Sequence, residues 1–438
     1  MITSNIGRKF LKAYNEKYHT QYDGKTFFTY VFFPLFFDHH KYMMTAGNSP
    51  FENPKISWEK MLKGQIPFET KDKREHRFED FINKVENGFL DASVAWGYPA
   101  SDEREFQTTS SQKTDIDLSI GQEDVYLSWV GAALGVGVQG GMSILFNDSQ
   151  VWLDTFEGWT FYRKILDGTD LLRGNQINTW NGQWLAHRYD VLMYAADNPM
   201  ANFSPFDTPK NEILSVAVVP WNNLIVNMAR SLKNQQLLGY IYNFGQTNTT
   251  VGFIPFFLEK IRRPMQLYRK LFGIQNFKSA LKLWGTAVGL RELCRSGAIG
   301  LKAMEPKGLK PYMDGKKLPK KARDEKETVT YDVYKTWILA MLNNEQLWDK
   351  SQELAKILEQ CSVNKDKALS TKARNAVNNV LATNNKRGFI DAITSIVGSL
   401  SDPASLCSIV KDVHEMPTDN VPYFLTLVRF QYAAINNK

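Results

Sequence analysis

The segment Leu171-Leu-Arg-Gly-Asn-Gln-Ile-Asn-Thr-Trp-Asn-Gly-Gln-Trp-Leu-Ala-His-Arg-Tyr189 stands out in the 438-residue chain. It gathers side-chain amides, two glycines and two tryptophans, and no carboxylate lies between Arg173 and Arg188. Amides offer a donor and an acceptor on one flat group, tryptophan offers a stacking face, and glycine permits close backbone approach. These groups suit the recognition of base edges and phosphates better than proton transfer. The alternative interpretation is a buried loop-to-helix junction whose amides satisfy backbone groups.

Two further segments have a similar composition. Residues 107–114 consist of hydroxyls, amides and one lysine, and residues 240–255 combine glycine, amide, hydroxyl and aromatic side chains without an acid. Polar loops that lack carboxylates and have cations nearby suit contact with a phosphate backbone. The alternative for residues 107–114 is an ordinary exposed loop. The cations that follow residues 240–255 are Lys260, Arg262, Arg263, Arg269 and Lys270.

The overall composition indicates a folded protein with a preference for polyanionic partners. The chain is 43% hydrophobic and 13% aromatic and carries a formal net charge of +7. Its length suggests two or three domains. Three widely separated cysteines form no CxxC pair, which favours a reducing compartment. The most hydrophobic run, residues 27–37, contains Pro34 and is too short to span a bilayer. We therefore expect a soluble, cytoplasmic protein with no membrane partner.

Hydrophobic periodicity predicts several short elements in the N-terminal part of the chain. Residues 6–18 and 123–134 carry apolar side chains at helical spacing. Residues 27–37 favour a buried strand or packing ridge over a helix, because aromatic and β-branched residues are enriched in strands. Residues 142–146 and 211–220 are also strand-like.

The string Gly135-Val-Gly-Val-Gln-Gly140 matches the GxGxxG pattern of dinucleotide-binding proteins. That fingerprint requires a strand before the glycines and a helix after them. Here the predicted order is reversed, with a helix leading in and a strand leading out. The glycines therefore indicate a tight helix-to-strand turn with close backbone packing, and no dinucleotide cofactor is expected.

The expected fold class is α+β, with a mixed α/β N-terminal domain followed by a C-terminal helical bundle. Residues 1–300 would form the first domain, which binds nucleic acid or other subunits. Residues 301–328, rich in lysine, proline and glycine, are expected to form a loop or linker. Residues 329–438 are nearly free of proline and glycine and show successive amphipathic patterns, which predicts about four helices.

No recognisable catalytic motif is present, so we expect a protein that is not an enzyme and has no metal or other cofactor. The pair His39 and His40 beside Asp38 has no further ligand at a recognisable spacing. Two acid pairs, Asp115 with Asp117 and Asp154 with Glu157, have a spacing that is common in proteins.

Four short strings together resemble the large subunit of type I CRISPR Cascade, a crRNA-guided surveillance complex. They are Gln107-Thr-Thr-Ser-Ser-Gln-Lys-Thr114, Gly174-Asn-Gln-Ile-Asn-Thr-Trp-Asn-Gly182, Gly245-Gln-Thr-Asn-Thr-Thr-Val-Gly-Phe-Ile-Pro255 and Tyr423-Phe-Leu-Thr-Leu-Val-Arg-Phe430. The resemblance implies a non-catalytic subunit that recognises the target-flanking motif (PAM), aids duplex opening and recruits the helicase-nuclease. It also implies crRNA, target double-stranded DNA and the other Cascade subunits as partners, and a C-terminal bundle similar to the small subunit.

Under this hypothesis amides meet the flanking duplex, partly in the minor groove, and cations hold phosphates. The expected amide contacts are Gln107, Gln112, Asn175, Gln176, Asn178 and Asn248. The expected phosphate contacts are Lys113, Arg262, Arg263, Lys316, Lys317, Lys320 and Lys321.

Two other functions remain open at the level of sequence. A metal-dependent nuclease could assemble its acids from distant positions. A structural interaction module of another defence complex would contact no nucleic acid without its partners.

Overall fold

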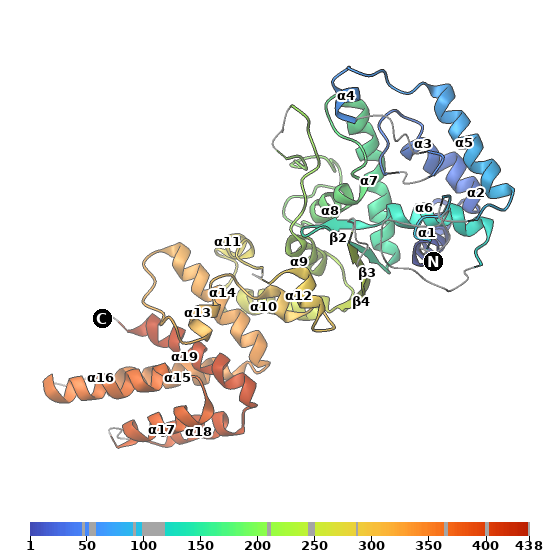
Figure 1. Ribbon diagram of the computed structural model, residues 1–438. Coiled ribbons are helices and arrows are strands. Elements are labelled where there is room, and N and C mark those ends of the chain that lie inside the picture. Colours follow the sequence, from blue (N-terminus) through green and yellow to red (C-terminus); the bar gives the residue numbers. More distant parts are fainter. Residues whose placement is uncertain are drawn as a thin grey trace. The chain divides into compact units, whose positions relative to one another are not determined.

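In the computed structural model the chain forms two compact units (Figure 1). The sheet unit comprises Met1–Leu258 and Leu290–Ile299, and the helical unit comprises Glu259–Gly289 and Gly300–Lys438. Residues 301–328 belong to the helical unit. The structure describes residues 1–45, 49–51, 58–90, 93–98, 119–207, 212–243, 250–285, 288–362, 367–398 and 403–436.

The sheet unit combines a four-stranded antiparallel sheet, in the order β1-β2-β3-β4, with helices, which confirms the α+β class. Its strands are β1 (Val136–Val138), β2 (Met142–Phe146), β3 (Leu237–Asn243) and β4 (Thr250–Phe256). Its helices are α1 (Ile2–Tyr18), α2 (Gly24–Phe27), the π-helix η1 (Phe28–Phe32), α3 (Phe33–Phe36), α4 (Trp58–Leu62), α5 (Lys71–Glu86), α6 (Gln122–Ala133), α7 (Ser149–Gly168), α8 (Ile177–Arg188), α9 (Trp221–Ser231) and α12 (Leu290–Cys294).

The α1 and α6 helices pack in close backbone contact through two glycines. A Cβ atom on Gly7 would lie 2.1 Å from the carbonyl oxygen of Leu127, and one on Gly131 would lie 1.9 Å from that of Thr3. Real side chains do not tolerate such distances, so only glycine fits at these two positions. The predicted helices at residues 6–18 and 123–134 are therefore confirmed, and their glycines set the distance between them.

The phenylalanine-rich run is helical, so the strand expected at residues 27–37 is wrong, whereas a packing ridge is present. Phe28, Phe32 and Phe36 recur every four residues, which aligns them on one face of a helix, and all three are completely buried. The ring centroids of Phe32 and Phe36 lie 4.1 Å apart in a stacked arrangement. Burial of this aromatic face outweighs the strand preference of the individual residues.

The glycine-rich string was predicted to be a turn between a helix and a strand, but it also contains strand β1, which follows α6 closely. The α6 helix ends at Ala133, and the β1–β2 hairpin turns at Gly140 and Gly141, whose φ angles of +93° and +70° favour glycine. The α8 helix packs tightly on β1, because a Cβ on Gly182 would lie 2.1 Å from the carbonyl oxygen of Gly137. The string therefore serves backbone packing in an antiparallel sheet.

No continuous strand forms within residues 212–220 of the described chain, so the strand predicted at 211–220 is wrong. Its backbone bonds go to different segments: Leu214 bridges Leu172, and Val216 bridges Phe206. The backbone N–H of Val216 donates to the side chain of Gln176. Because successive residues find different partners, no ladder develops.

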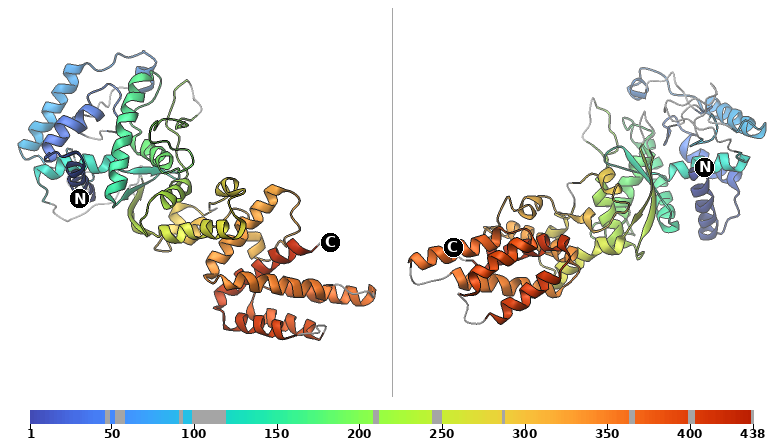
Figure 2. Two further views of the ribbon diagram at one scale, coloured as in Figure 1. Left: turned by 180° about the vertical axis from the view of Figure 1, so that it is seen from behind. Right: turned by 60° about the horizontal axis from the view of Figure 1, so that its bottom comes forward.

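The helical unit contains further helices around α19 (Val421–Ile435). The α15 helix (Gln346–Ser362) packs along α19, and the two lie side by side in all the views (Figures 1 and 2). The described residues that follow position 328 are mostly helical. The other elements are α10 (Leu258–Phe272), α11 (Phe277–Leu281), the 3-10 helix η3 (Leu301–Met304), α13 (Lys310–Met313), α14 (Glu325–Leu342), α16 (Lys367–Ala382), α17 (Lys386–Val397), α18 (Ala404–Glu415) and the 3-10 helix η4 (Thr418–Asn420).

Candidate nucleic-acid interface

The amide-rich segment enters α8 along an extended contact with residues 41–43. The backbone N–H of Asn175, a residue in the left-handed region at φ 57°, donates to the carbonyl of Tyr42 over 2.7 Å. That of Ile177 donates to Met43 over 3.0 Å. A Cβ on Gly174 would lie 2.6 Å from the same Tyr42 oxygen. Glycine at 174 and asparagine at 175, which tolerates positive φ, therefore fix where the amides lie.

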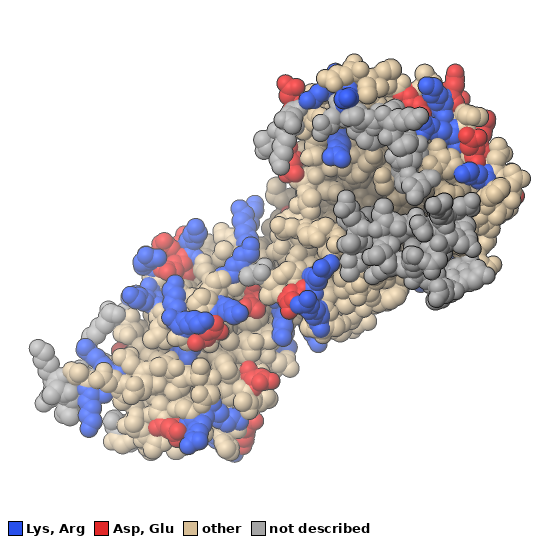
Figure 3. All heavy atoms as spheres, in the orientation of Figure 1, with Lys and Arg blue, Asp and Glu red and all other residues tan. Residues whose placement is uncertain are grey.

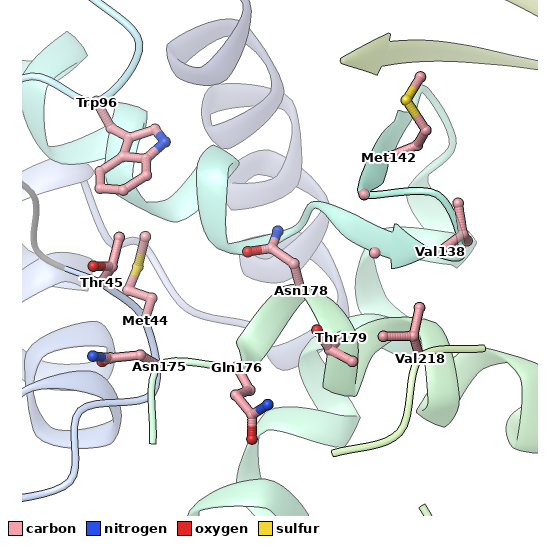
Figure 4. A pocket seen from close by; sticks show the side chains of 12 residues that line it. Met44, Thr45, Trp96, Val138, Met142, Asn175, Gln176, Asn178, Thr179 and Val218 are labelled. Atoms are coloured by element: carbon pink, nitrogen blue, oxygen red, sulfur yellow. The ribbon is translucent and has the colours of Figure 1, made fainter. Parts of the chain in front are cut away.

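A cavity of about 270 Å³ opens beside this segment (Figure 4). It is enclosed by the start of α8, the β1–β2 hairpin and the segments around residues 44 and 96. Its lining residues are Met44, Thr45, Trp96, Gly137, Val138, Gly141, Met142, Asn175, Gln176, Asn178, Thr179 and Val218. Three of the six predicted amide contacts thus come together around one cavity.

Asn178 presents an acceptor to this cavity. Its Nδ2 donates to the carbonyl oxygen of Gly135 over 2.9 Å and lies 3.4 Å from that of Ala132, which fixes the rotation of the amide. The side chain points toward the space below Trp96, with Oδ1 on that side (Figure 4). Because the amide nitrogen is already engaged, the group that remains for a ligand is a carbonyl oxygen.

Trp96 supplies the aromatic face of the cavity, and sequence reasoning missed it. Its backbone is held on both sides: its N–H donates to Ser128 Oγ over 2.8 Å, and its carbonyl accepts from Thr3 Oγ1 over 2.8 Å. The indole packs on Trp129 with ring centroids 5.3 Å apart and remains half-buried. The residues that hold Trp96 are far away in sequence, so no local pattern identifies it.

Other amides of the segment serve the fold. Gln176 turns away from Trp96 in Figure 4, and its Oε1 accepts from the backbone of Val216 over 3.0 Å. Asn181 is fully buried and donates to the carbonyls of Ala133 and Gly135 over 2.7 and 2.8 Å. The predicted role in recognition therefore fits Asn178 better than Gln176.

The two tryptophans and the histidine of the segment belong to the core. Trp180 and Trp184 are completely buried, and their indole N–H groups donate to Gly158 and Asp154 carbonyls over 2.9 and 2.7 Å. His187 stacks on a phenylalanine ring, and burial lowers the pKa of its imidazole. The loop-to-helix interpretation is correct for these positions.

Four of the predicted site residues lie outside the described residues: Gln107, Gln112, Lys113 and Asn248. The other predicted cations belong to the helical unit. Arg262 and Arg263 lie half-buried on α10, where Arg263 contacts the side chain of Asn343.

The lysine group after α13 divides into two pairs. Lys316 forms an ion pair with Asp314 at 3.4 Å, and the ammonium of Lys317 lies 4.9 Å from the centre of the Tyr312 ring. Lys320 and Lys321 instead line a second cavity, of about 420 Å³, within the helical unit. The second pair therefore borders a concave surface.

Charge is distributed unequally between the units. The helical unit contains 28 Lys and Arg residues against 17 Asp and Glu, whereas the sheet unit contains 25 against 29. Figure 3 shows Lys and Arg side chains spread over the visible face of the helical unit. The positive charge of the whole chain thus comes from the helical unit, which is the part suited to polyanions.

The described residues contain no group of three or more His, Cys, Asp and Glu side chains that could hold a metal ion. His39 Nδ1 lies 3.0 Å from Arg163 Nη2 and accepts from the Lys41 backbone, and Nε2 lies 3.2 Å from Asp167. Both ring nitrogens thus have protein partners.

The acid pair Asp154 and Glu157 is also tied to its neighbours. Asp154 is 2% exposed and accepts from the Tyr189 hydroxyl over 2.8 Å, and both acids lie near Arg188. Asp115 and Asp117 lie outside the described residues.

Within the described ranges, no helix combines the length and apolar character that a bilayer span needs. Comparisons with protein-family models, curated proteins and solved structures found no match for this chain.

Proposed function

We propose that this chain is a non-catalytic, cytoplasmic subunit of a crRNA-guided type I Cascade complex, which recognises the motif that flanks the target in double-stranded DNA. In that complex it aids duplex opening and recruits the helicase-nuclease. The observation that carries the proposal is the cavity of the sheet unit, where Asn178 Oδ1 and the Trp96 ring face a common space. An amide acceptor beside an aromatic face is suited to contact a base.

The hydrogen bonds of Asn178 determine which group of a base its side chain can contact. Its NH2 group is engaged by Gly135, so only the carbonyl oxygen meets the ligand, and its partner must be a donor. In the minor groove the donor on a base pair is the exocyclic amine of guanine. We therefore expect a preference for a G·C pair in the flanking motif.

The charge of the helical unit supports a complementary role. Its excess of Lys and Arg favours any phosphate backbone without reading sequence. Affinity for the duplex then comes mainly from the helical unit, and discrimination comes from the cavity of the sheet unit.

Purification of the tagged chain from its native host tests the assembly. We expect a discrete, repeat-flanked RNA and several co-purifying subunits. A lone protein without RNA would contradict the proposal, and divalent-ion-dependent cleavage by that protein would point to a nuclease instead.

The role of the cavity is tested on the assembled complex with a library of flanking motifs. Asn178→Ala should reduce discrimination between motifs roughly tenfold, because one base contact contributes about 1–3 kcal/mol. Gln183→Ala is the matched control: it also removes one amide-to-carbonyl bond of α8, over 2.9 Å to Ala217, but Gln183 does not line the cavity. Equal discrimination by both variants would refute the assignment.

A further inference from the structure

The helical unit holds a buried cation on α19, Arg429, that has no acidic partner among the residues that the structure describes. Arg429 is 2% exposed, and its Nε donates to the carbonyl of Leu381 over 2.7 Å. Nη1 donates to the carbonyl of Tyr312 over 3.1 Å and Nη2 to that of Thr383, while Thr426 Oγ1 lies 3.4 Å from Nη1. One of the five N–H donors of the guanidinium is left without a partner among the described residues.

All these acceptors are neutral, so the positive charge remains. Among described residues, no carboxylate lies within ion-pair distance of Arg429, whereas the other buried cation of this unit, Lys335, pairs with Asp332 at 2.7 Å. The carbonyls of Leu381 and Thr383 lie at the C-terminal end of α16, whose dipole offsets only roughly half a charge. A buried charge is costly unless an anion compensates it.

Arg429 forms part of the wall of the 420 Å³ cavity that Lys320 and Lys321 border. The burial of Arg429, and the lack of a described carboxylate within ion-pair distance of it, distinguish this site from an ordinary lysine-rich surface. Three cationic side chains from two separate segments therefore surround one concavity. Its volume falls in the range of roughly 300–1,000 Å³ that is usual for small-molecule sites.

The remaining walls suit a nucleoside. Tyr432 contributes an aromatic ring, and Asn378 contributes an amide with both a donor and an acceptor. Pro319 and Leu381 add apolar surface. A ligand that carries a phosphate and a flat polar ring matches this combination, because a phosphate monoester has a charge of about −1.5 to −2 at neutral pH.

We propose that this cavity binds a nucleoside 5′-phosphate group, with the phosphate against Lys320, Lys321 and Arg429 and the nucleoside toward Tyr432 and Asn378. The same chemistry occurs in a free nucleotide and at the 5′-phosphorylated end of a nucleic-acid strand. The site lies wholly within the helical unit, so the proposal does not depend on the Cascade assignment.

Calorimetric titration of the purified full chain tests the site with four probes. These are AMP, adenosine, a 5′-phosphorylated tetranucleotide and the same tetranucleotide with a 5′-hydroxyl end. We expect AMP to bind at least tenfold more tightly than adenosine. Preference for the phosphorylated tetranucleotide over AMP would identify a strand end as the ligand, and comparable binding would identify a free nucleotide. Absence of AMP and tetranucleotide binding, or equal binding with and without phosphate, would overturn the proposal.

Variants separate the cavity from general electrostatics. The double variant Lys320→Gln, Lys321→Gln alters exposed side chains and should weaken AMP binding at least tenfold. The control double variant Lys316→Gln, Lys326→Gln removes the same charge from exposed positions outside the cavity and should change it less than twofold. Equal losses in the two would refute a defined site. Co-purification of RNA tests the proposed function separately, because AMP titration needs neither RNA nor partner subunits.

Discussion

A Cβ atom on Gly135 would lie 2.3 Å from Nδ2 of Asn178, the atom that anchors the cavity's amide. It would also lie 2.8 Å from the Tyr242 hydroxyl and 2.9 Å from Ser143 Oγ. The glycine that allows the turn into β1 therefore also makes room for the recognition side chain. The fold and the candidate site thus both depend on the absence of a side chain at Gly135.

Gly135→Ala should destabilise the sheet unit by about 1–3 kcal/mol, because the added methyl overpacks a closed site. It should also reduce motif discrimination, since the Asn178 amide must shift. Chemical denaturation of the full chain measures the first effect. Gly168→Ala is the control: a Cβ there meets no atom within 4 Å, so stability should be unchanged or slightly higher. Equal stability of the two variants would contradict the packing argument.

The sequence pattern predicted the helices and strands that are determined by residues close together in the chain. The helix before Gly135 and the strand after it followed from apolar spacing and glycine placement, and both are present. The run at residues 27–37 was misread, because composition favoured a strand while the four-residue spacing of Phe28, Phe32 and Phe36 is helical. In that run the spacing was the better signal.

Residues that depend on tertiary neighbours escaped prediction. Trp96 lines the cavity because Thr3 and Ser128 hold its backbone, and neither is near it in sequence. Arg429 carried a weak local signal, a single charge in the apolar run of α19. Its partners, however, come from α13 and from the end of α16, which no periodicity reveals.

Arg429→Met should destabilise the helical unit by about 3 kcal/mol. The change leaves three backbone carbonyls without their donor, and each unpaired buried group costs about 1–3 kcal/mol, partly offset by removal of a buried charge. Urea denaturation followed by circular dichroism measures this loss. Arg374→Met, on the exposed part of α16, should change stability by less than about 0.5 kcal/mol. A similar small effect at Arg429 would show that its hydrogen bonds contribute little.

The lowered pKa values of two histidines predict that the protein loses stability in acid. Burial, the largest cause, lowers the pKa of both His39 and His40 from 6.5 to about 4, helped by the positive charges of Arg163 and Lys41. Between these values the unfolded chain binds protons that the folded chain does not. The free energy of unfolding therefore falls as the pH decreases from 6.5 toward 4.

His40→Gln tests this dependence, because it removes one of the two groups. The curve of unfolding free energy against pH should become flatter between pH 6.5 and 4. His76→Gln is the control, because it removes an exposed histidine of α5. The curve of this variant should match that of the wild-type chain. If His40→Gln also left it unchanged, the burial of His40 would not be what makes the chain sensitive to acid.

The charge imbalance between the units predicts a distinct response to salt. If Lys317 holds a phosphate, Lys317→Gln should weaken binding to every duplex alike and reduce the slope of log affinity against log salt by about 0.9. Lys164→Gln removes the same charge from an exposed position of the sheet unit and should leave the slope unchanged. Duplex binding by the assembled complex between about 50 and 200 mM salt measures both. Equal slopes for the two variants would mean that Lys317 of the helical unit does not hold a phosphate. A change in motif preference on Lys317→Gln would mean that discrimination is not confined to the cavity beside Asn178.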